Sequence, residues 1–304
     1  MSIYATISST ISKTISGTIG FGQSFVQRFG AGLSAAYFLA DLGSKRGTVD
    51  GAINPVVRVR RTNGDLRAFT ANDISTGVLL AWVGTGGSDN GLVAKLYDGS
   101  GNHRDATQYT VADMPKIVNA GAVVVDVNGN VSLDFAENKF LSANSLASIA
   151  SGTDRPITQF QIADPDNDSA STSGIAGFGL SYNATPIRYS GIKNGVYLFD
   201  ERANNEALAQ AGGGTVASGL FLMSTVSTGN ARTGRANGTQ FGKNTTNLGE
   251  TILDRFTIGA LARNTVALYF SGKISGVIVY AADKTTDIPA AEAALAKEYK
   301  ITLA

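Results

Sequence analysis

The feature that most constrains the fold is the recurrence of Asn-Gly. The pair occurs at Asn63-Gly64, Asn90-Gly91, Asn128-Gly129, Asn194-Gly195 and Asn237-Gly238. Asn-Gly supplies the positive φ angles that a two-residue hairpin turn needs. Most of the pairs lie between strand-like runs, such as Val123–Val125 and Val131–Phe135. Strands at this density, with few helices between them, predict an all-β sandwich or barrel.

The amino-acid composition supports this fold and excludes several classes of binding partner. The chain has 36 Gly, 6 Pro and no Cys, which indicates many tight turns and excludes disulfides and thiolate metal sites. Lys and Arg number 25 against 24 Asp and Glu, a net charge of +1. No global field attracts nucleic acid or an anionic membrane, so we expect neither as a partner. The alternating Arg58 and Arg60, followed by Arg61, are typical of the wet face of a strand.

The N-terminal segment differs from the rest in its Thr-Ile-Ser repeat. Its isoleucines recur every four residues at Ile3, Ile7, Ile11, Ile15 and Ile19. On an extended strand this spacing places all of them on one face. The segment has too little apolar surface to fold alone, so residues 1–32 are predicted to form an arm that anchors on a neighbouring subunit. A disordered low-complexity tail is the alternative. A short helix is expected within 23–29.

The C-terminal segment is expected to form one helix. Asp287 and Pro289 mark its start. Apolar residues at helical spacing follow at Ile288, Ala291, Leu295 and Tyr299. The start of the chain lacks the pattern of a secretory signal, and no apolar run is long enough for a membrane span. Synthesis in a host cytoplasm is therefore expected.

Residues 33–304 resemble a known group of domains. The matching runs are Pro55–Arg61, Phe69–Ala71, Leu80–Gly84, Leu96–Gln108, Met114–Val118 and Leu133–Phe135. This succession resembles the concanavalin A-like (laminin-G-like) domains of phage tail-fibre and other virion proteins. It is also similar to the catalytic domain of the fungal arabinofuranosidase B family, which has a Tyr-Asp-Gln-Ser-Gly stretch where this chain has Tyr97 to Gly101. The resemblance implies a concanavalin-like antiparallel β-sandwich, or jelly roll.

The chain departs from the arabinofuranosidases where their chemistry lies. Gly99 stands where those families commonly have Gln, and the stretch comparable to their nucleophile strand, 173–179, contains no carboxylate. Retaining glycoside hydrolysis needs two carboxyl groups about 5 Å apart. Asp134 and Glu137 are an acidic pair, but such spacing is common by chance. We therefore expect no catalytic residue and no enzyme.

The densest polar cluster follows a predicted strand. There Asp98, Asn102 and His103 can hydrogen-bond sugar hydroxyls while Tyr97 or Trp82 stacks on a sugar ring. These five residues are the candidate carbohydrate site. The alternative is a structural turn, because Asp and Ser side chains commonly bond their own backbone.

No metal or cofactor is expected. His103 is the single histidine, so a zinc site or a Ser-His-Asp triad would depend on it alone. The run Asp164–Asp168 has alternate carboxylates but lacks the later Gly and Glu of a calcium loop, and a solvated loop explains it. The glycine-rich segments lack the Lys-Ser/Thr of a phosphate loop.

These observations predict a phage virion structural protein, either a capsid decoration or a tail or fibre component. The arm would bind other virion proteins and further copies of the chain, and the sandwich would face outward, towards host surface polysaccharide. The expected location is the virion. Two alternatives stay open: a glycoside hydrolase of arabinofuranosidase type, and a stand-alone carbohydrate-binding module.

Overall fold

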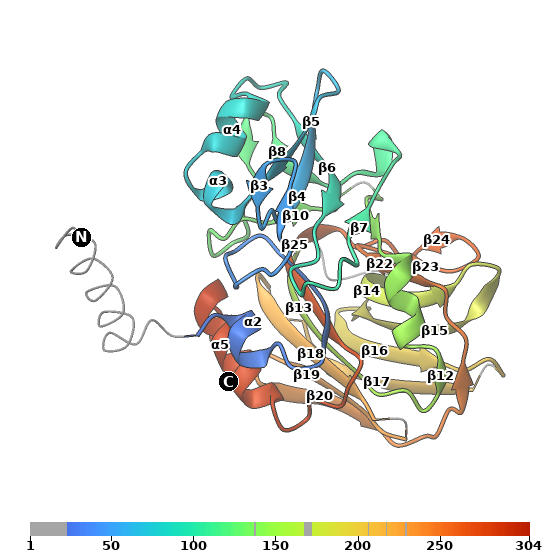
Figure 1. Cartoon of the computed structure of the whole chain (residues 1–304). Coiled ribbons are helices and arrows are strands. Elements are labelled where there is room, and N and C mark those ends of the chain that lie inside the picture. Colours follow the sequence, from blue (N-terminus) through green and yellow to red (C-terminus); the bar gives the residue numbers. More distant parts are fainter. Residues whose placement is uncertain (1–22, 137, 167–171, 206, 217, 229) are drawn as a thin grey trace, which may run out of the picture.

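The computed structural model describes residues 23–304 except 137, 167–171, 206, 217 and 229. Two antiparallel β-layers pack face to face, and a smaller sheet with two short helices is joined to them at one end (Figure 1). The prediction of an all-β antiparallel sandwich with a C-terminal helix is therefore confirmed.

The first layer has the strand order β20-β19-β18-β13-β25-β1. Its strands are β1 (Leu33–Phe38), β13 (Ile157–Pro165), β18 (Phe221–Ser227), β19 (Arg232–Ala236), β20 (Thr239–Asn244) and β25 (Gly272–Tyr280). The second layer has the order β17-β16-β15-β14-β22-β11. Its strands are β11 (Leu141–Ser142), β14 (Ser173–Leu180), β15 (Asn183–Lys193), β16 (Val196–Arg202), β17 (Leu208–Thr215) and β22 (Arg255–Ile258).

The smaller sheet is built from the segment between β1 and β11. Its strands are β4 (Val57–Arg61), β5 (Leu66–Phe69), β6 (Gly91–Leu96), β7 (Ala106–Thr107), β8 (Lys116–Asn119), β9 (Ala122–Val123) and β10 (Leu133–Asp134). Three short ribbons pair β2 (Thr48–Val49) with β3 (Ala52–Ile53), β12 (Gly152–Thr153) with β21 (Glu250–Thr251), and β23 (Leu261–Ala262) with β24 (Val266–Ala267). The helices are α2 (Phe25–Phe29), α3 (Ala71–Ser75), α4 (Val78–Val83) and α5 (Ile288–Tyr299), with 3₁₀ turns η1 (Val111–Asp113) and η2 (Asn144–Ile149).

Two of the five Asn-Gly pairs form the expected two-residue hairpin turns, and two more lie in longer turns between paired segments. Asn194-Gly195 and Asn237-Gly238 are the two-residue loops of the β15–β16 and β19–β20 hairpins, and all four residues have positive φ. Asn63-Gly64 turns β4 into β5, and Asn128-Gly129 lies inside the turn closed by the Val125–Val131 bridge. Asn90-Gly91 forms no hairpin, because the chain reaches Asn90 from a loop after α4; the strand expected after this pair is β6, which begins at Gly91.

Strand β25 lies at the junction of these parts. It pairs with β13 along its length on one edge, and with β1 and β10 on the other. Opposite β13, Ile162 pairs with Gly276 and Ala163 with Ile274, so Ser275 is the extra residue of a β-bulge. A bulge re-aims the side chain that it carries. Here it turns the Ser275 hydroxyl to Asp126.

Helix α5 covers the outer face of the first layer (Figure 1). The predicted stripe is confirmed, because Ile288, Ala291, Leu295 and Tyr299 are all buried there. Helix α2 belongs to the same cluster through Phe25 and Val26, although the sequence places it within the segment assigned to the arm. The arm isoleucines, Ile3 to Ile19, lie outside the described residues, so the arm's role stays a prediction.

Helices α3 and α4 were not expected. Thr70 caps α3 in a capping box: its hydroxyl accepts from Asp73 N at 3.0 Å, and its own N–H donates to the Asp73 carboxylate at 2.9 Å. This Thr-x-x-Asp pattern was the available signal. Within the described ranges, no helix is both long and apolar enough to cross a membrane.

An ionic cluster is buried between the two layers. Glu201 of β16 lies 3.4 Å from Arg188 Nε of β15 and hydrogen-bonds Arg232 of β19, and all three side chains are at most 1% exposed. Ser227 of β18 donates a further hydrogen bond to Glu201 at 3.1 Å. Burial lowers the pKa of Arg188, and the neighbouring Glu201 opposes this effect. The cluster thus connects both layers through one carboxylate.

Replacing Glu201 by Gln is expected to lower the free energy of unfolding by about 3–5 kcal/mol, because two buried guanidinium groups lose their counter-charge. Denaturant unfolding followed by circular dichroism measures the change. The matched control is Glu250→Gln, on the exposed end of β21, which should change stability by less than about 0.5 kcal/mol. Equal midpoints for Glu201→Gln and the parent would contradict a stabilising role.

Candidate functional site

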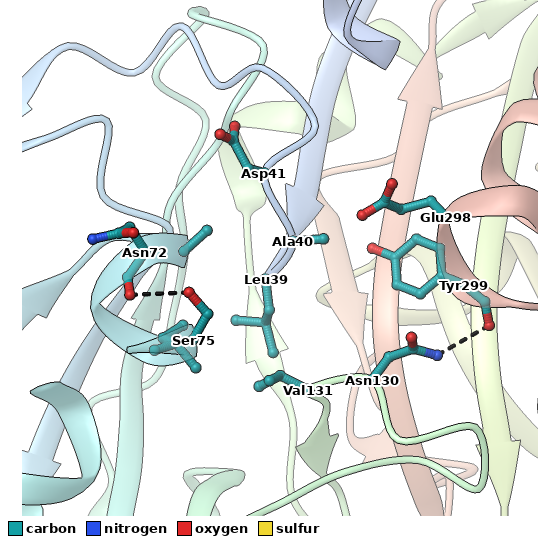
Figure 2. A pocket seen from close by; sticks show the side chains of 11 residues that line it. Leu39, Ala40, Asp41, Asn72, Ser75, Asn130, Val131, Glu298 and Tyr299 are labelled. Atoms are coloured by element: carbon teal, nitrogen blue, oxygen red, sulfur yellow. Dashed lines mark hydrogen bonds between the residues drawn. The ribbon is translucent and has the colours of Figure 1, made fainter. Parts of the chain in front are cut away.

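A pocket of about 370 Å³ opens between the end of β1, helix α3 and the C-terminal end of α5 (Figure 2). Its walls include the buried Leu39 and Ile74 and the half-buried Val131. The polar side chains around it are Asp41, Asn72, Ser75, Asn130 and Glu298. A concave apolar surface with a few polar groups is the usual form of a small-ligand site, and the volume falls in the common range of about 300–1,000 Å³.

One wall of the pocket is the turn 126–130. The buried Asp126 carboxylate accepts from Asn130 N and Nδ2 at 3.0 Å each, and from Ser275 Oγ at 3.0 Å. Asn130 Nδ2 also donates to the Tyr299 carbonyl at 3.0 Å, and Asn128 Nδ2 to that of Lys300 at 2.8 Å. The turn therefore binds the carbonyls at the end of α5, and the Asn130 amide oxygen faces the pocket (Figure 2).

The opposite wall is α3. The Asn72 carbonyl accepts from Ser75 Oγ at 3.1 Å and from Thr76 Oγ1 at 2.7 Å, which orders the last turn of this helix. The Asn72 side-chain amide has no hydrogen-bond partner in the described part of the chain and is exposed at the pocket. An amide carries both donors and an acceptor, so Asn72 can bind either kind of ligand group.

Two carboxylates give the pocket its charge. Asp41 follows β1 and Glu298 lies on α5, and Figure 2 shows them on the same rim. Neither forms an ion pair with any described residue; Asp41 accepts one hydrogen bond, from Gly43 N at 3.2 Å. Burial raises the pKa of Tyr299 far above its usual value, so its hydroxyl stays protonated and donates to the Ser275 carbonyl at 3.3 Å. The Tyr299 hydroxyl is therefore occupied, and the carboxylates and amides are the pocket groups that can hydrogen-bond a ligand.

The predicted carbohydrate residues lie elsewhere, in the loop after β6. Asp98 is fully buried, and its carboxylate accepts from Ala36 N at 2.9 Å, Ser100 N at 2.9 Å, Ser100 Oγ at 2.8 Å and Arg104 N at 3.0 Å. Asn102 donates to the Leu33 carbonyl at 2.9 Å. These bonds fix the loop against β1, as the structural-turn alternative expects.

The other three predicted residues are not gathered around one opening. Tyr97 is 2% exposed, with Arg46 over its ring. His103 is exposed and contacts Arg46 through Nδ1. Trp82, half-buried on α4, packs instead on Phe69 and Arg61. Sugar binding by these five residues stays a prediction, since no ligand contact tests it.

The other acidic candidates show no cluster of ligands. Asp134 lies in a small hollow beside Lys116 and Lys139, and its proposed partner Glu137 is outside the described residues. Asp164 accepts from Val127 N at 2.9 Å, and Asp166 pairs with Lys273 at 3.2 Å. The third carboxylate of that run, Asp168, lies outside the described residues. Among the residues that the structure describes, no group of three potential metal ligands is found.

Sequence reasoning missed the pocket because its residues come from distant segments. Leu39 to Asp41, the residues of α3, Asn130 with Val131, and the end of α5 meet only through tertiary packing. The capping box of α3 was a usable signal for one wall. Nothing in the sequence indicates that Glu298 and Asp41 line the same pocket.

No protein-family model matches the sequence, and no curated protein matches it either. Among solved structures, an arabinofuranosidase complexed with arabinofuranosyl-α-1,2-xylobiose covers 92% of this chain, with a TM-score of 0.62 and 10% identity. A GH54 α-L-arabinofuranosidase soaked with a cyclic sulfate inhibitor covers 90%, with a TM-score of 0.58 and 11% identity. The chain spans 66% and 65% of the length of these two proteins. At such identities the likeness shows the fold alone.

A third structure, the CBM40 domain of a Ruminococcus gnavus IT-sialidase bound to α2,3-sialyllactose, covers 54% of the chain at a TM-score of 0.41, too low to carry an argument. The arabinofuranosidase part of the resemblance is thus confirmed for the fold. The prediction that the protein is not an enzyme is wrong as an exclusion, because two solved structures that share the fold over 90% or more of this chain are glycoside hydrolases. The phage part of the resemblance is not supported by these structures and stays a prediction.

The structural role of Asp98 predicts that its replacement destabilises the fold. Asp98→Asn places an NH₂ group against backbone donors, so it should lower the free energy of unfolding by about 2–3 kcal/mol. Chemical denaturation measures the loss, with Asp283→Asn, an exposed carboxylate bonded to nearby Thr285, as control. Unchanged stability of Asp98→Asn together with lost sugar binding would favour the ligand-binding role instead.

Proposed function

We propose that the protein binds a saccharide in the pocket between β1, α3 and α5. The observation that carries this proposal is the combination of two carboxylates that form no ion pair with a described residue, those of Asp41 and Glu298, with amide groups over an apolar surface. The fold shared with arabinofuranosidases supports the proposal, since one of those proteins is complexed with an arabinofuranosyl xylobiose.

The chemistry of a sugar suits each part of the pocket. Hydroxyl groups donate to the carboxylates of Asp41 and Glu298, and hydrogen bonds to charged acceptors are the stronger kind. The Asn72 amide and the Asn130 amide oxygen add acceptors, and Asn72 adds donors. The C–H face of a sugar ring can lie on Leu39 and Val131. A neutral saccharide fits better than an acidic one, because the carboxylates repel like charge.

Calorimetry with an arabinofuranosyl xylobiose and a panel of neutral oligosaccharides tests the proposal. Asp41→Asn and Glu298→Gln should each weaken binding by about tenfold or more, because a hydrogen bond to a charged group contributes about 1.5–3 kcal/mol. Glu250→Gln, the same chemical change far from the pocket in sequence, should leave the affinity unchanged. No binding by the parent, or equal binding by all variants, would refute the pocket as the site.

A second candidate function is glycoside hydrolysis in the same pocket, favoured by the two carboxylates on one rim. Glycosidases use one carboxyl group as acid and another as nucleophile or base. The expected outcome is release of nitrophenol from 4-nitrophenyl α-L-arabinofuranoside, with a loss of about 10²-fold or more in kcat for Asp41→Asn or Glu298→Gln. If the parent protein binds the saccharide but does not hydrolyse it, hydrolysis is excluded and saccharide binding is the function that is left.

The virion role is a further proposal, carried only by the Thr-Ile-Ser arm and the phage-like resemblance. In it, the arm binds other virion proteins or further copies of the chain, and the pocket contacts host surface polysaccharide. The pocket proposal does not depend on it.

A further inference from the structure

A second concave surface lies on the outer face of the small sheet, over β4, β6 and β7, with a volume of about 180 Å³. It shares no lining residue with the pocket beside α3 and α5. We name it the basic groove. Its main side chains are Arg58, Arg60, Leu66, Lys95, Gln108 and Tyr109.

Strand alternation places the cations of the basic groove. Val57 and Val59 of β4 are fully buried in the core, so Arg58 and Arg60 project from the opposite face. In the ladder, Arg58 is opposite Lys95 of β6, and Arg60 is opposite Leu66 of β5. Three positive side chains therefore line one side of the sheet.

These charges are only partly neutralised. Arg58 lies 3.5 Å from Asp50 in an exposed pair, and its buried Nε has no hydrogen-bond partner. Lys95 lies 3.5 Å from Asp105, but Arg46 already binds that carboxylate through two nitrogens. Arg60 forms no ion pair with a described residue, and no carboxylate is among the residues that line the groove. The groove thus has an excess of positive charge.

An exposed aromatic ring borders the basic groove. Tyr109 is 87% exposed, which is unusual for so large a side chain. The buried Gln108 orders its loop: its side-chain oxygen accepts from Tyr109 N at 2.9 Å and Thr110 N at 3.0 Å, and its nitrogen donates to the Phe140 carbonyl at 3.2 Å. An exposed tyrosine on an ordered stretch of backbone offers a sugar ring a large apolar contact area. Leu66, 44% exposed, adds apolar surface to the same groove.

We propose that the basic groove binds an acidic saccharide, with a sugar carboxylate on Arg58 and Arg60 and a sugar ring on Tyr109. Guanidinium groups bind carboxylates through two parallel hydrogen bonds, and Arg60, which lines the groove and forms no ion pair with a described residue, can offer such a pair of donors. The groove is smaller than the about 300–1,000 Å³ of sites that enclose a whole ligand, so it suits one unit of a longer chain. The inference goes beyond the pocket, whose own charge disfavours such a ligand.

Calorimetric titration of the full chain with trigalacturonate, and with its methyl ester as a neutral match, tests the proposal. The acid should bind at least about tenfold more tightly than the ester. Arg58→Gln and Arg60→Gln should each weaken binding of the acid by about tenfold, and Tyr109→Ala by about fivefold. Added salt should weaken binding, because exposed ion pairs are screened.

The matched control is Arg67→Gln on β5, whose arginine packs over Phe69 and does not line the groove. This variant should bind trigalacturonate with the affinity of the parent. Asp41→Asn should do so too, because Asp41 lines the other pocket, and this result would distinguish the two sites. The proposal is overturned if acid and ester bind equally, if neither binds, or if Arg67→Gln weakens binding as much as Arg58→Gln. Equal binding of oligo(dT), lost in the same variants, would also overturn it by showing an unselective basic surface.

Discussion

Strand β25 (Gly272–Tyr280) is the element on which the other parts of the molecule depend. It joins β13 to β1 and β10, so the sandwich and the small sheet share one hydrogen-bonded seam. Its bulge at Ser275 allows Ile274 and Val277 both to enter the inner core, while Ile278 packs under α5. The Ser275 hydroxyl bonds Asp126, and its carbonyl accepts from Tyr299. The walls of the pocket are therefore held by the same strand that holds the layers.

The two candidate surfaces differ in charge for a structural reason. The pocket is formed where loops and helix ends meet, and Asp41 and Glu298 line it without an ion pair to any described residue. The basic groove lies on a sheet face, where the two-residue period of β4 presents Arg58 and Arg60 side by side. A neutral, hydroxyl-rich ligand suits the first and a carboxylated ligand the second. One fold thus offers two chemistries on surfaces that share no residue.

Much of the architecture could be predicted because local chemistry determined it. Asn194-Gly195 and Asn237-Gly238 form hairpins since their backbone angles match the turn. The stripe of α5 is buried because its period matches the helix. Asn90-Gly91 forms no hairpin, because helix α4 and a loop precede it and leave no strand on that side. Turn chemistry is thus informative only when strands stand on both sides.

The candidate site was less predictable from sequence. The sequence predicts Asp98 as a sugar-binding residue because it lies in a polar cluster, but its carboxylate accepts hydrogen bonds from backbone N–H groups. The sequence alone determined the all-β class, most of its turns, the terminal helix and the outward face of Arg58 and Arg60, because each follows from contacts within a few residues. Only the tertiary structure decided that Asp41 and Glu298 share a pocket and that Glu201 connects the two layers. Those contacts join residues far apart in the chain, and no local pattern encodes which distant segments pack together.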